Sequence, residues 1–292
     1  MKPDVMKKAY KSKIHNQRMT DCPSQSQTQL LDSLELNVQP FHVTKHVINV
    51  IGSPINASPF NTQIKMILDW ASNHESRVVC VANAHMLTEA YRHSGLSYVL
   101  KNADLVTPDG MPLVWMMRLI GARNQNRVAG MDILWALCQL APLQNVSVFF
   151  LGSEASILEK IKKKLEHEFP NLKIAGMEPL PFSPLTPTDD EAIIQKIHES
   201  GAEVVFVSLG CPKQEYWIDQ HKGKIQAVMI GLGGVFPIVA GLHKRAPSWM
   251  RESGLEWFYR LIQEPRRLGT RYIKTIPLFI WLALKQLLIL RS

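Results

Sequence analysis

The chain has 292 residues, 46% of them hydrophobic, which is enough for one large α/β domain or two small ones. Its formal net charge of +8 is concentrated at the two ends and predicts an anionic partner, either membrane lipid or nucleic acid. The sequence contains no RNA-binding aromatic signature, zinc finger or helix-turn-helix pattern, so we expect no nucleic-acid partner. Four cysteines without a CxxC pair indicate reduced thiols in the cytosol, and the basic N-terminus lacks the apolar core of a secretory signal.

Three segments follow one another along the chain. Residues 1–42 have no sustained period and predict a loosely ordered extension. Residues 43–245 alternate between strands and helices. Strands are expected at 47–51, 78–82, 103–106, 146–151, 172–175, 204–208 and 227–230. Helices are expected at 61–73, 84–94, 111–120, 131–140, 157–169, 191–199 and 212–221. The strands are continuous apolar runs, which is typical of a parallel sheet covered by helices on both faces.

Residues 246–292 form a basic, aromatic appendage, for which we expect two or three helices. Within it, residues 276–290 are apolar apart from Lys285 and Gln286. Fifteen residues extend only about 22 Å as a helix, so we expect this helix to lie in the membrane interface and not to cross the bilayer. Contacts with anionic lipid are expected from Arg260, Arg266, Arg267, Arg271 and Lys274. The alternative is that the helices pack on the core with their charges solvated.

The sequence Thr107-Pro-Asp-Gly110 stands between an expected strand and an expected helix. A carboxylate at such a junction lies where open α/β sheets bind ligands, and the N–H groups of the helix start favour anions. Asp109 is therefore a candidate site residue. Pro-Asp-Gly is also a strong turn signal, and the spacing alone favours a plain turn.

Other candidates follow strand ends or precede helices. Asn83 could hydrogen-bond a sugar hydroxyl, although capping the next helix is the simpler interpretation. His85 could be a general base, but a lone histidine at a helix start is more often a surface or cap residue. Arg127 could clamp a diphosphate through its fork of donors, or pair with Asp132 on the surface.

Two glycine-containing junctions complete the set of candidates. Gly210-Cys-Pro-Lys-Gln-Glu215 joins a strand to a helix and places Gln214 in the first turn of that helix. This arrangement suits a phosphate or another polar ligand, and the alternative is an ordinary connection between a strand and a helix. Gly231-Leu-Gly-Gly234 would let a ligand approach the backbone. It is not the dinucleotide fingerprint, because Phe236 occupies the last glycine position, and the chain has no Asp-x-Asp pair for a metal diphosphate.

Taken together, these motifs resemble the WecG/TagA/CpsF family of bacterial glycosyltransferases, from about residue 47 to the C-terminus. The resemblance implies a Rossmann-like core with a C-terminal membrane-binding appendage. It implies transfer of a sugar, often N-acetylmannosamine, from a UDP-sugar to a polyprenyl-diphosphate-linked sugar at the inner membrane face, with inversion and without a metal or cofactor. It assigns Asp109 as the base. It assigns substrate binding to Asn83, Thr107, Arg127, Gly130, Asp132, Gly210, Gln214, Gly233 and Gly234. The family often has Thr two residues before the Asn, where this chain has Val81, so a hydroxyl contact that bears on the donor sugar is lost.

The chemistry of the candidates agrees with this family. Inversion by direct displacement needs one carboxylate to take the acceptor proton, and cations or N–H dipoles to hold the departing UDP. Two other functions stay open: a nucleotide-dependent oxidoreductase, against which the broken glycine fingerprint argues, and a non-catalytic membrane-bound scaffold. The sequence leaves the oligomeric state open, a homo-oligomer included.

Overall fold

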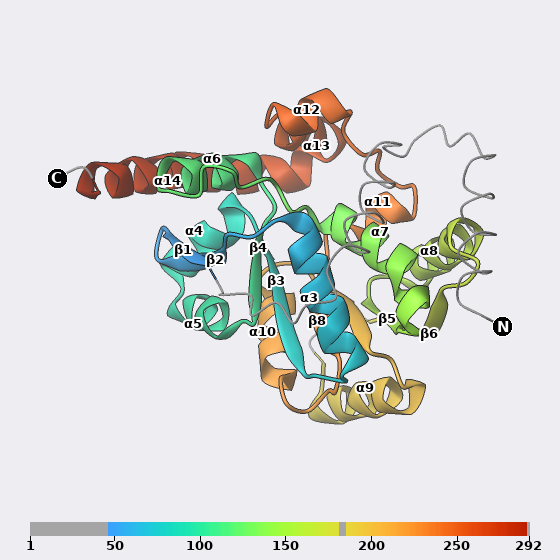
Figure 1. Ribbon diagram of the computed structural model, residues 1–292. Coiled ribbons are helices and arrows are strands. Elements are labelled where there is room, and N and C mark those ends of the chain that lie inside the picture. Colours follow the sequence, from blue (N-terminus) through green and yellow to red (C-terminus); the bar gives the residue numbers. More distant parts are fainter. Residues whose placement is uncertain (1–45, 181–184, 291–292) are drawn as a thin grey trace, which may run out of the picture. The chain divides into compact units, whose positions relative to one another are not determined.

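The computed structural model describes residues 46–180 and 185–290, and its central feature is a six-stranded sheet (Figure 1). The chain divides into two units, Met1–Val43 and Thr44–Ser292, and the described residues belong to the second. In spatial order the strands are β4 (Leu105–Pro108), β3 (Arg77–Ala82), β8 (Val228–Gly231), β7 (Val204–Ser208), β5 (Ser147–Gly152) and β6 (Lys173–Glu178). Every neighbouring pair is parallel, which confirms the expected fold class. The extension expected at residues 1–42 lies outside the described residues.

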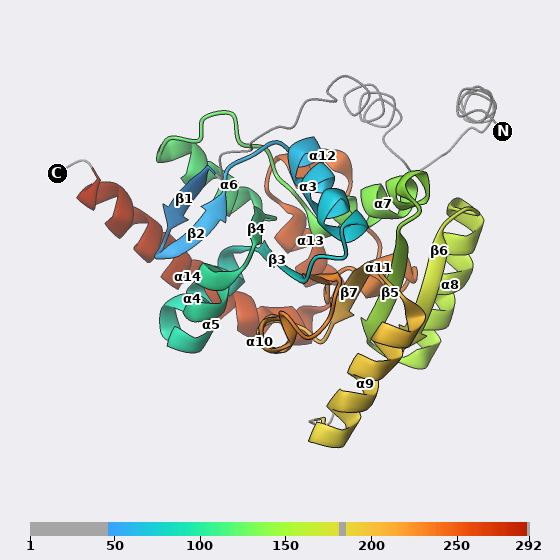
Figure 2. The same cartoon turned by 60° about the horizontal axis from the view of Figure 1, so that its bottom comes forward.

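Helices cover both faces of this sheet, as Figure 2 shows with α3 and α10 on opposite sides of the strands. On one face lie α4 (Ala84–Arg92), α5 (Ser94–Asn102), α9 (Pro187–Ser200) and α10 (Lys213–His221). On the other lie α3 (Phe60–Ser72), α7 (Gly130–Leu140), the short 3-10 helix Ala141–Gln144, α8 (Ala155–Glu168) and α11 (Phe236–Val239). The sequence analysis expected a single helix at 84–94 and missed α5, which begins after a break at His93.

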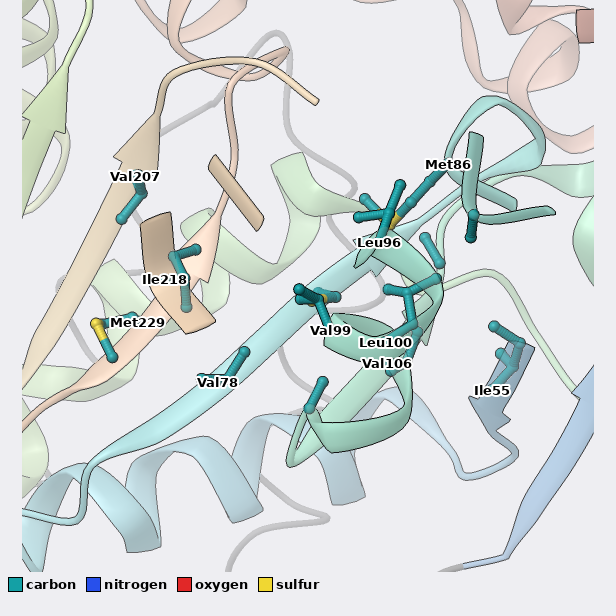
Figure 3. Packing of buried hydrophobic residues seen from close by; sticks show 14 of the residues in the cluster. Ile55, Val78, Met86, Leu96, Val99, Leu100, Val106, Val207, Ile218 and Met229 are labelled. Carbon is teal, nitrogen blue, oxygen red and sulfur yellow. The ribbon is translucent and has the colours of Figure 1, made fainter. Parts of the chain in front are cut away.

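Alternation along β7 shows how the two faces are filled. Val207 packs with Met229 and with Ile218 of α10 in the cluster drawn in Figure 3. Phe206 points to the opposite face, where its ring centroid lies 5.1 Å from that of Phe150. Since successive strand residues face opposite ways, a strand buried on both faces must be apolar at every position.

The first predicted strand belongs to a different sheet from the one expected. Residues 47–51 were assigned to the parallel sheet, but β1 (Val47–Val50) pairs antiparallel with β2 (Ser53–Asn56) in a separate hairpin. Its turn has two successive positive φ angles, 52° at Ile51 and 79° at Gly52, as a tight two-residue hairpin turn requires. Asn56 then joins the hairpin to the sheet, because its Oδ1 accepts a 2.7 Å hydrogen bond from the backbone N–H of Val106 in β4.

The appendage consists of α12 (Ser248–Glu252), α13 (Glu256–Gln263) and α14 (Pro265–Ile289), in agreement with the expected two or three helices. The expected fifteen-residue apolar helix is wrong in length, because α14 has 25 residues and continues through Pro277. Of the described helices, it is the one long and apolar enough to cross a membrane by length and composition. We predicted that this helix is too short to cross a bilayer, and that prediction of its length is wrong.

One side of α14 packs against the core beside α4, as both ribbon views show. Phe279 and Leu282 are buried there, while Trp281 and Leu288 on the same helix are exposed. Gln286 ties the far end of α14 to the β1–β2 hairpin through two hydrogen bonds of 2.8 Å. Its Oε1 accepts from the N–H of Ile51, and its Nε2 donates to the carbonyl of Asn49.

Candidate active site

The candidate residues gather at the carboxyl ends of β3, β4, β7 and β8. Ala82 and Pro108 are register partners, so Asn83 and Asp109 leave the sheet side by side. A Cβ on Gly110 would lie 3.7 Å from the Cβ of Asn83, which shows how closely the two loops approach. This edge is where parallel α/β sheets bind ligands.

Asp109 is held at the end of β4, directly before α6 (Met111–Leu119). Its backbone N–H donates a 2.7 Å hydrogen bond to the carbonyl of Ala82. Burial raises the pKa of the Asp109 carboxyl to about 6, with the charges of Arg127 and Arg260 lowering it and those of Glu256 and Asp132 raising it. The carboxyl is thus ionised at neutral pH, and its pKa is close enough to 7 for it to accept a proton during the reaction.

Arg127 pairs with the appendage and not with Asp132. Its Nη1 donates to the carboxylate of Glu256 at the start of α13, and both side chains are largely buried. Asp132 is bound instead by Arg245. The surface pair considered in the sequence analysis is therefore wrong, because Glu256 in the appendage binds Arg127 and Arg245, just before the appendage, binds Asp132. Burial lowers the pKa of the Arg127 guanidinium, but Asp109 and Glu256 raise it, so that the pKa ends above its ordinary value.

The basic residues of the appendage divide into two groups. Arg260 reaches the sheet edge, where its Nη2 would lie 3.3 Å from a Cβ on Gly234. Arg271 is half-buried and acts electrostatically on Cys211, in the loop after β7, and on His85, in the first turn of α4. Three others are exposed: Arg266, Arg267 and Lys274. The expected membrane contacts thus include two arginines that lie at the candidate site.

Gln214 joins two loops inside the protein. Its Oε1 accepts hydrogen bonds from the N–H groups of Gly210, at 3.2 Å, and Gly233, at 3.0 Å. Its Nε2 donates to Glu215 at 2.7 Å, and both side chains are buried. A Cβ on Gly233 would lie only 2.6 Å from that Oε1, so the glycine is required by the close approach. The geometry makes Gln214 a brace for the ends of β7 and β8.

Asn83 caps α4, as its simpler interpretation predicted. Its Oδ1 accepts from the N–H groups of His85 and Met86, at 3.1 and 3.2 Å, and the cap does not use its NH2 group. His85 lies 3.2 Å from the hydroxyl of Thr275 and so links α4 to α14. Burial, with a further contribution from Arg271, lowers its pKa to about 4, so His85 is neutral at physiological pH.

Two further predicted residues lie just beneath the edge. Thr107 is fully buried in β4, and its hydroxyl has no hydrogen-bond partner among the described residues. Gly130 begins α7, where a Cβ would come within 2.9 Å of Leu232. Thr107 is thus a buried polar group without a partner in the described part of the chain, whereas Gly130 is needed for packing.

Glu256 was missed by the sequence analysis because the appendage was treated as a membrane-facing addition. Arg245, the last residue before the appendage, was not considered as a partner of Asp132. A sequence signal existed for Glu256, which is an acidic residue in the first turn of a short helix, where it favours the helix dipole. That signal indicates a helix start and does not indicate which distant arginine the carboxylate binds.

Comparison with known proteins places the chain in a family. Residues 48–292 match the model of the glycosyl transferase WecG/TagA/CpsF family. An N-acetylglucosaminyldiphosphoundecaprenol N-acetyl-beta-D-mannosaminyltransferase of Bacillus subtilis strain 168 is 32% identical over 77% of this chain and 88% of its own length. Proteins of the same name from Bacillus spizizenii and Staphylococcus aureus strain MW2 are 33% and 24% identical, over 74% and 80% of this chain and 82% and 91% of their own lengths. The chain therefore belongs to the WecG/TagA/CpsF family of glycosyl transferases.

Proposed function

We propose that this enzyme transfers N-acetylmannosamine from UDP-N-acetylmannosamine to N-acetylglucosaminyl-diphosphoundecaprenol, with inversion at the anomeric carbon. The names of the relatives support the transferred sugar and the acceptor. The observation that carries the mechanism is the Asp109 carboxylate, which stands at the ligand-binding edge of the sheet with a pKa of about 6 and with Arg127 and Arg260 nearby.

In the proposed reaction, an acceptor hydroxyl oxygen forms a bond to the anomeric carbon of the donor while the bond from that carbon to the UDP oxygen breaks. Asp109 takes the hydroxyl proton as the new bond forms, which makes the oxygen a better nucleophile. Arg127 and Arg260 stabilise the negative charge that develops on the departing diphosphate. These guanidinium groups supply the positive charge that a metal ion gives other glycosyltransferases, so we propose a reaction without metal or cofactor.

The sugar contacts are assigned by position. Asn83 has an NH2 group that its cap does not use, so it can bind a polar substrate. Thr107 is assigned to the same contacts, but its hydroxyl is fully buried, without a hydrogen-bond partner in the described part of the chain, so a substrate would have to displace the side chains that cover it. Asp132, Gly210 and Gly234 lie around the same edge. Gln214 and Gly233 would act by holding the loops in place.

A donor and acceptor screen tests the activity. UDP release is measured with UDP-N-acetylmannosamine, UDP-N-acetylglucosamine and UDP-glucose, with and without a polyprenyl-diphosphate N-acetylglucosamine acceptor, and in the presence of a chelator. We expect acceptor-dependent UDP release with the first donor, unaffected by the chelator, and a product of inverted configuration by NMR. If none of the donors releases UDP, the result would favour a non-catalytic scaffold. Oxidation or reduction of an added nicotinamide nucleotide would favour an oxidoreductase.

We also propose that the enzyme docks peripherally on the cytoplasmic face of the cell membrane, with the exposed side of α14 in the interface. Trp281, Leu284 and Leu288 are all more than half exposed on this helix, and such apolar side chains favour the interface. The opposite side of the helix contacts the core and would have to detach for the helix to cross the bilayer.

Flotation with anionic vesicles tests this docking on the full chain. Replacing Trp281, Leu284 and Leu288 by serine should abolish flotation, while the matched control Leu143→Ser, an exposed leucine elsewhere, should not. Alkaline carbonate should extract the wild-type protein from membranes, because a peripheral protein is released by it. Flotation of the triple variant at the wild-type level would contradict the proposal, and resistance to carbonate would show a spanning helix.

A further inference from the structure

One ion pair joins the appendage directly to the candidate site. Arg127 lies on the segment between α6 and α7, and Glu256 is the first residue of α13, 129 positions later in the chain. The exposed fractions of the two side chains are 14% and 25%, so the pair is largely removed from solvent. An ion pair in such surroundings is far less screened than one on the surface.

The same helix brings a second charged group to the site. Arg260 follows Glu256 by four residues, which places both on one face of α13. Glu256 binds Arg127 near the end of β4, while the guanidinium of Arg260 lies against Gly234 beyond β8. One turn of one helix therefore contributes an anion and a cation to the sheet edge.

We propose that Glu256 is a positioning residue of the transferase: it holds the Arg127 guanidinium beside Asp109. This inference rests on the proposed function of Asp109 and Arg127. A guanidinium has five N–H donors, and the pair uses donors of Nη1 alone, so Arg127 keeps donors for a substrate diphosphate.

Glu256 also balances the charge around Asp109. The charged groups that act on Asp109 are Arg127, from the segment before α7, Asp132, from α7, and Glu256 and Arg260, from α13. Among these charges, Arg127 has the largest effect on the pKa of Asp109 and lowers it, while Glu256 has a smaller effect and raises it. If the charge of Glu256 is removed and Arg127 stays in place, the pKa of Asp109 falls. If Arg127 is released with it, the loss of the larger effect raises the pKa of Asp109.

The pH dependence of turnover tests this role. Glu256→Gln keeps the size and hydrogen-bonding capacity of the side chain but removes its charge. We expect kcat to fall and the acidic limb of the kcat profile to move to higher pH, because a released Arg127 no longer lowers the pKa of Asp109. The matched control is Glu252→Gln, an exposed glutamate on α12 that should leave the profile unchanged. An acidic limb that stays in place or moves to lower pH in Glu256→Gln would overturn the proposal, because Arg127 would then keep its position without the Glu256 charge.

UDP binding provides a readout that does not depend on Asp109. The dissociation constant of UDP is measured by calorimetry for Glu256→Gln, Arg127→Gln and the double variant. If Glu256 acts through Arg127, its replacement should change the constant in the wild-type background, by about 2- to 100-fold for residues in contact, and have no effect once Arg127 is replaced. The same effect in both backgrounds, or none in either, would overturn the proposal.

Asp109→Asn distinguishes a failure of this inference from a failure of the proposed function. Wild-type turnover in Asp109→Asn would remove the proposed base, while the UDP measurements would still report on the Arg127–Glu256 pair. Conversely, loss of turnover in Asp109→Asn together with additive effects on UDP binding would leave the base in place and refute the role of Glu256.

Discussion

Replacing Asp109 by Asn should lower activity and raise the stability of the folded protein at the same time. Burial raises the pKa of this carboxyl from 3.8 to about 6, so ionising it costs more in the folded than in the unfolded state. A difference of about 2 in pKa corresponds to about 3 kcal/mol. Asparagine keeps the shape and removes the charge, so the gain in unfolding free energy at neutral pH is at most about 3 kcal/mol. Loss of the general base should lower kcat by about 10²–10⁴-fold.

The size of the stability effect depends on pH in a way that can be measured. The folded pKa lies above the unfolded one, so the unfolded state releases its proton first as the pH rises. The wild-type protein therefore loses stability from about pH 4 to about pH 6, and the Asn variant does not. Urea unfolding of both proteins across this range should show the advantage of the variant growing with pH. Wild-type turnover, or a stability difference independent of pH, would refute the reasoning.

Three other substitutions probe the same edge. Arg127→Ala should raise the KM for the UDP-sugar without unfolding the protein, and unchanged saturation curves for both substrates would remove Arg127 from the site. Gly233→Ala should lower the unfolding free energy by about 1–3 kcal/mol, because its Cβ would lie 2.6 Å from Oε1 of Gln214. Gly269→Ala is the control, because the added Cβ would meet no described atom within 4 Å apart from its own stretch of helix backbone, and it should stabilise helix α14 by up to about 1 kcal/mol in thermal unfolding. Thr107→Val should not lower the unfolding midpoint, since the hydroxyl has no partner among the described residues, but should raise the donor KM if that hydroxyl binds the sugar.

The apolar runs of the sequence were sufficient to predict the parallel sheet, because strands buried on both faces leave little room for polar residues. The approach of Asn83 and Asp109 followed from the same reasoning, since both stand at strand ends. The turn at Ile51 was not predictable in this way, because a β-branched residue rarely adopts a positive φ.

The sequence was least informative about contacts between distant segments. The periodicity of α14 indicates that one side is apolar, but not that this side covers α4 or that Gln286 reaches the hairpin. Similarly, Glu256 and Arg127 are 129 positions apart, and no local pattern connects them. Arg260 was expected on the membrane for the same reason, whereas its guanidinium lies against Gly234, in the loop after β8.

The bonds between Gln286 and the β1–β2 hairpin give this enzyme a built-in reporter of the position of its last helix. The amide hydrogen of Ile51 is held by a side chain from α14 and not by its own sheet, so its rate of exchange with solvent follows the release of that helix. If α14 rests in the membrane interface while keeping its contact with the core, this hydrogen stays protected on vesicles. If the helix leaves the core to enter the bilayer, the amide loses its acceptor and exchanges quickly. The exchange rate of the Ile51 amide hydrogen, in the turn between β1 and β2, can therefore distinguish the two membrane arrangements without any label on α14.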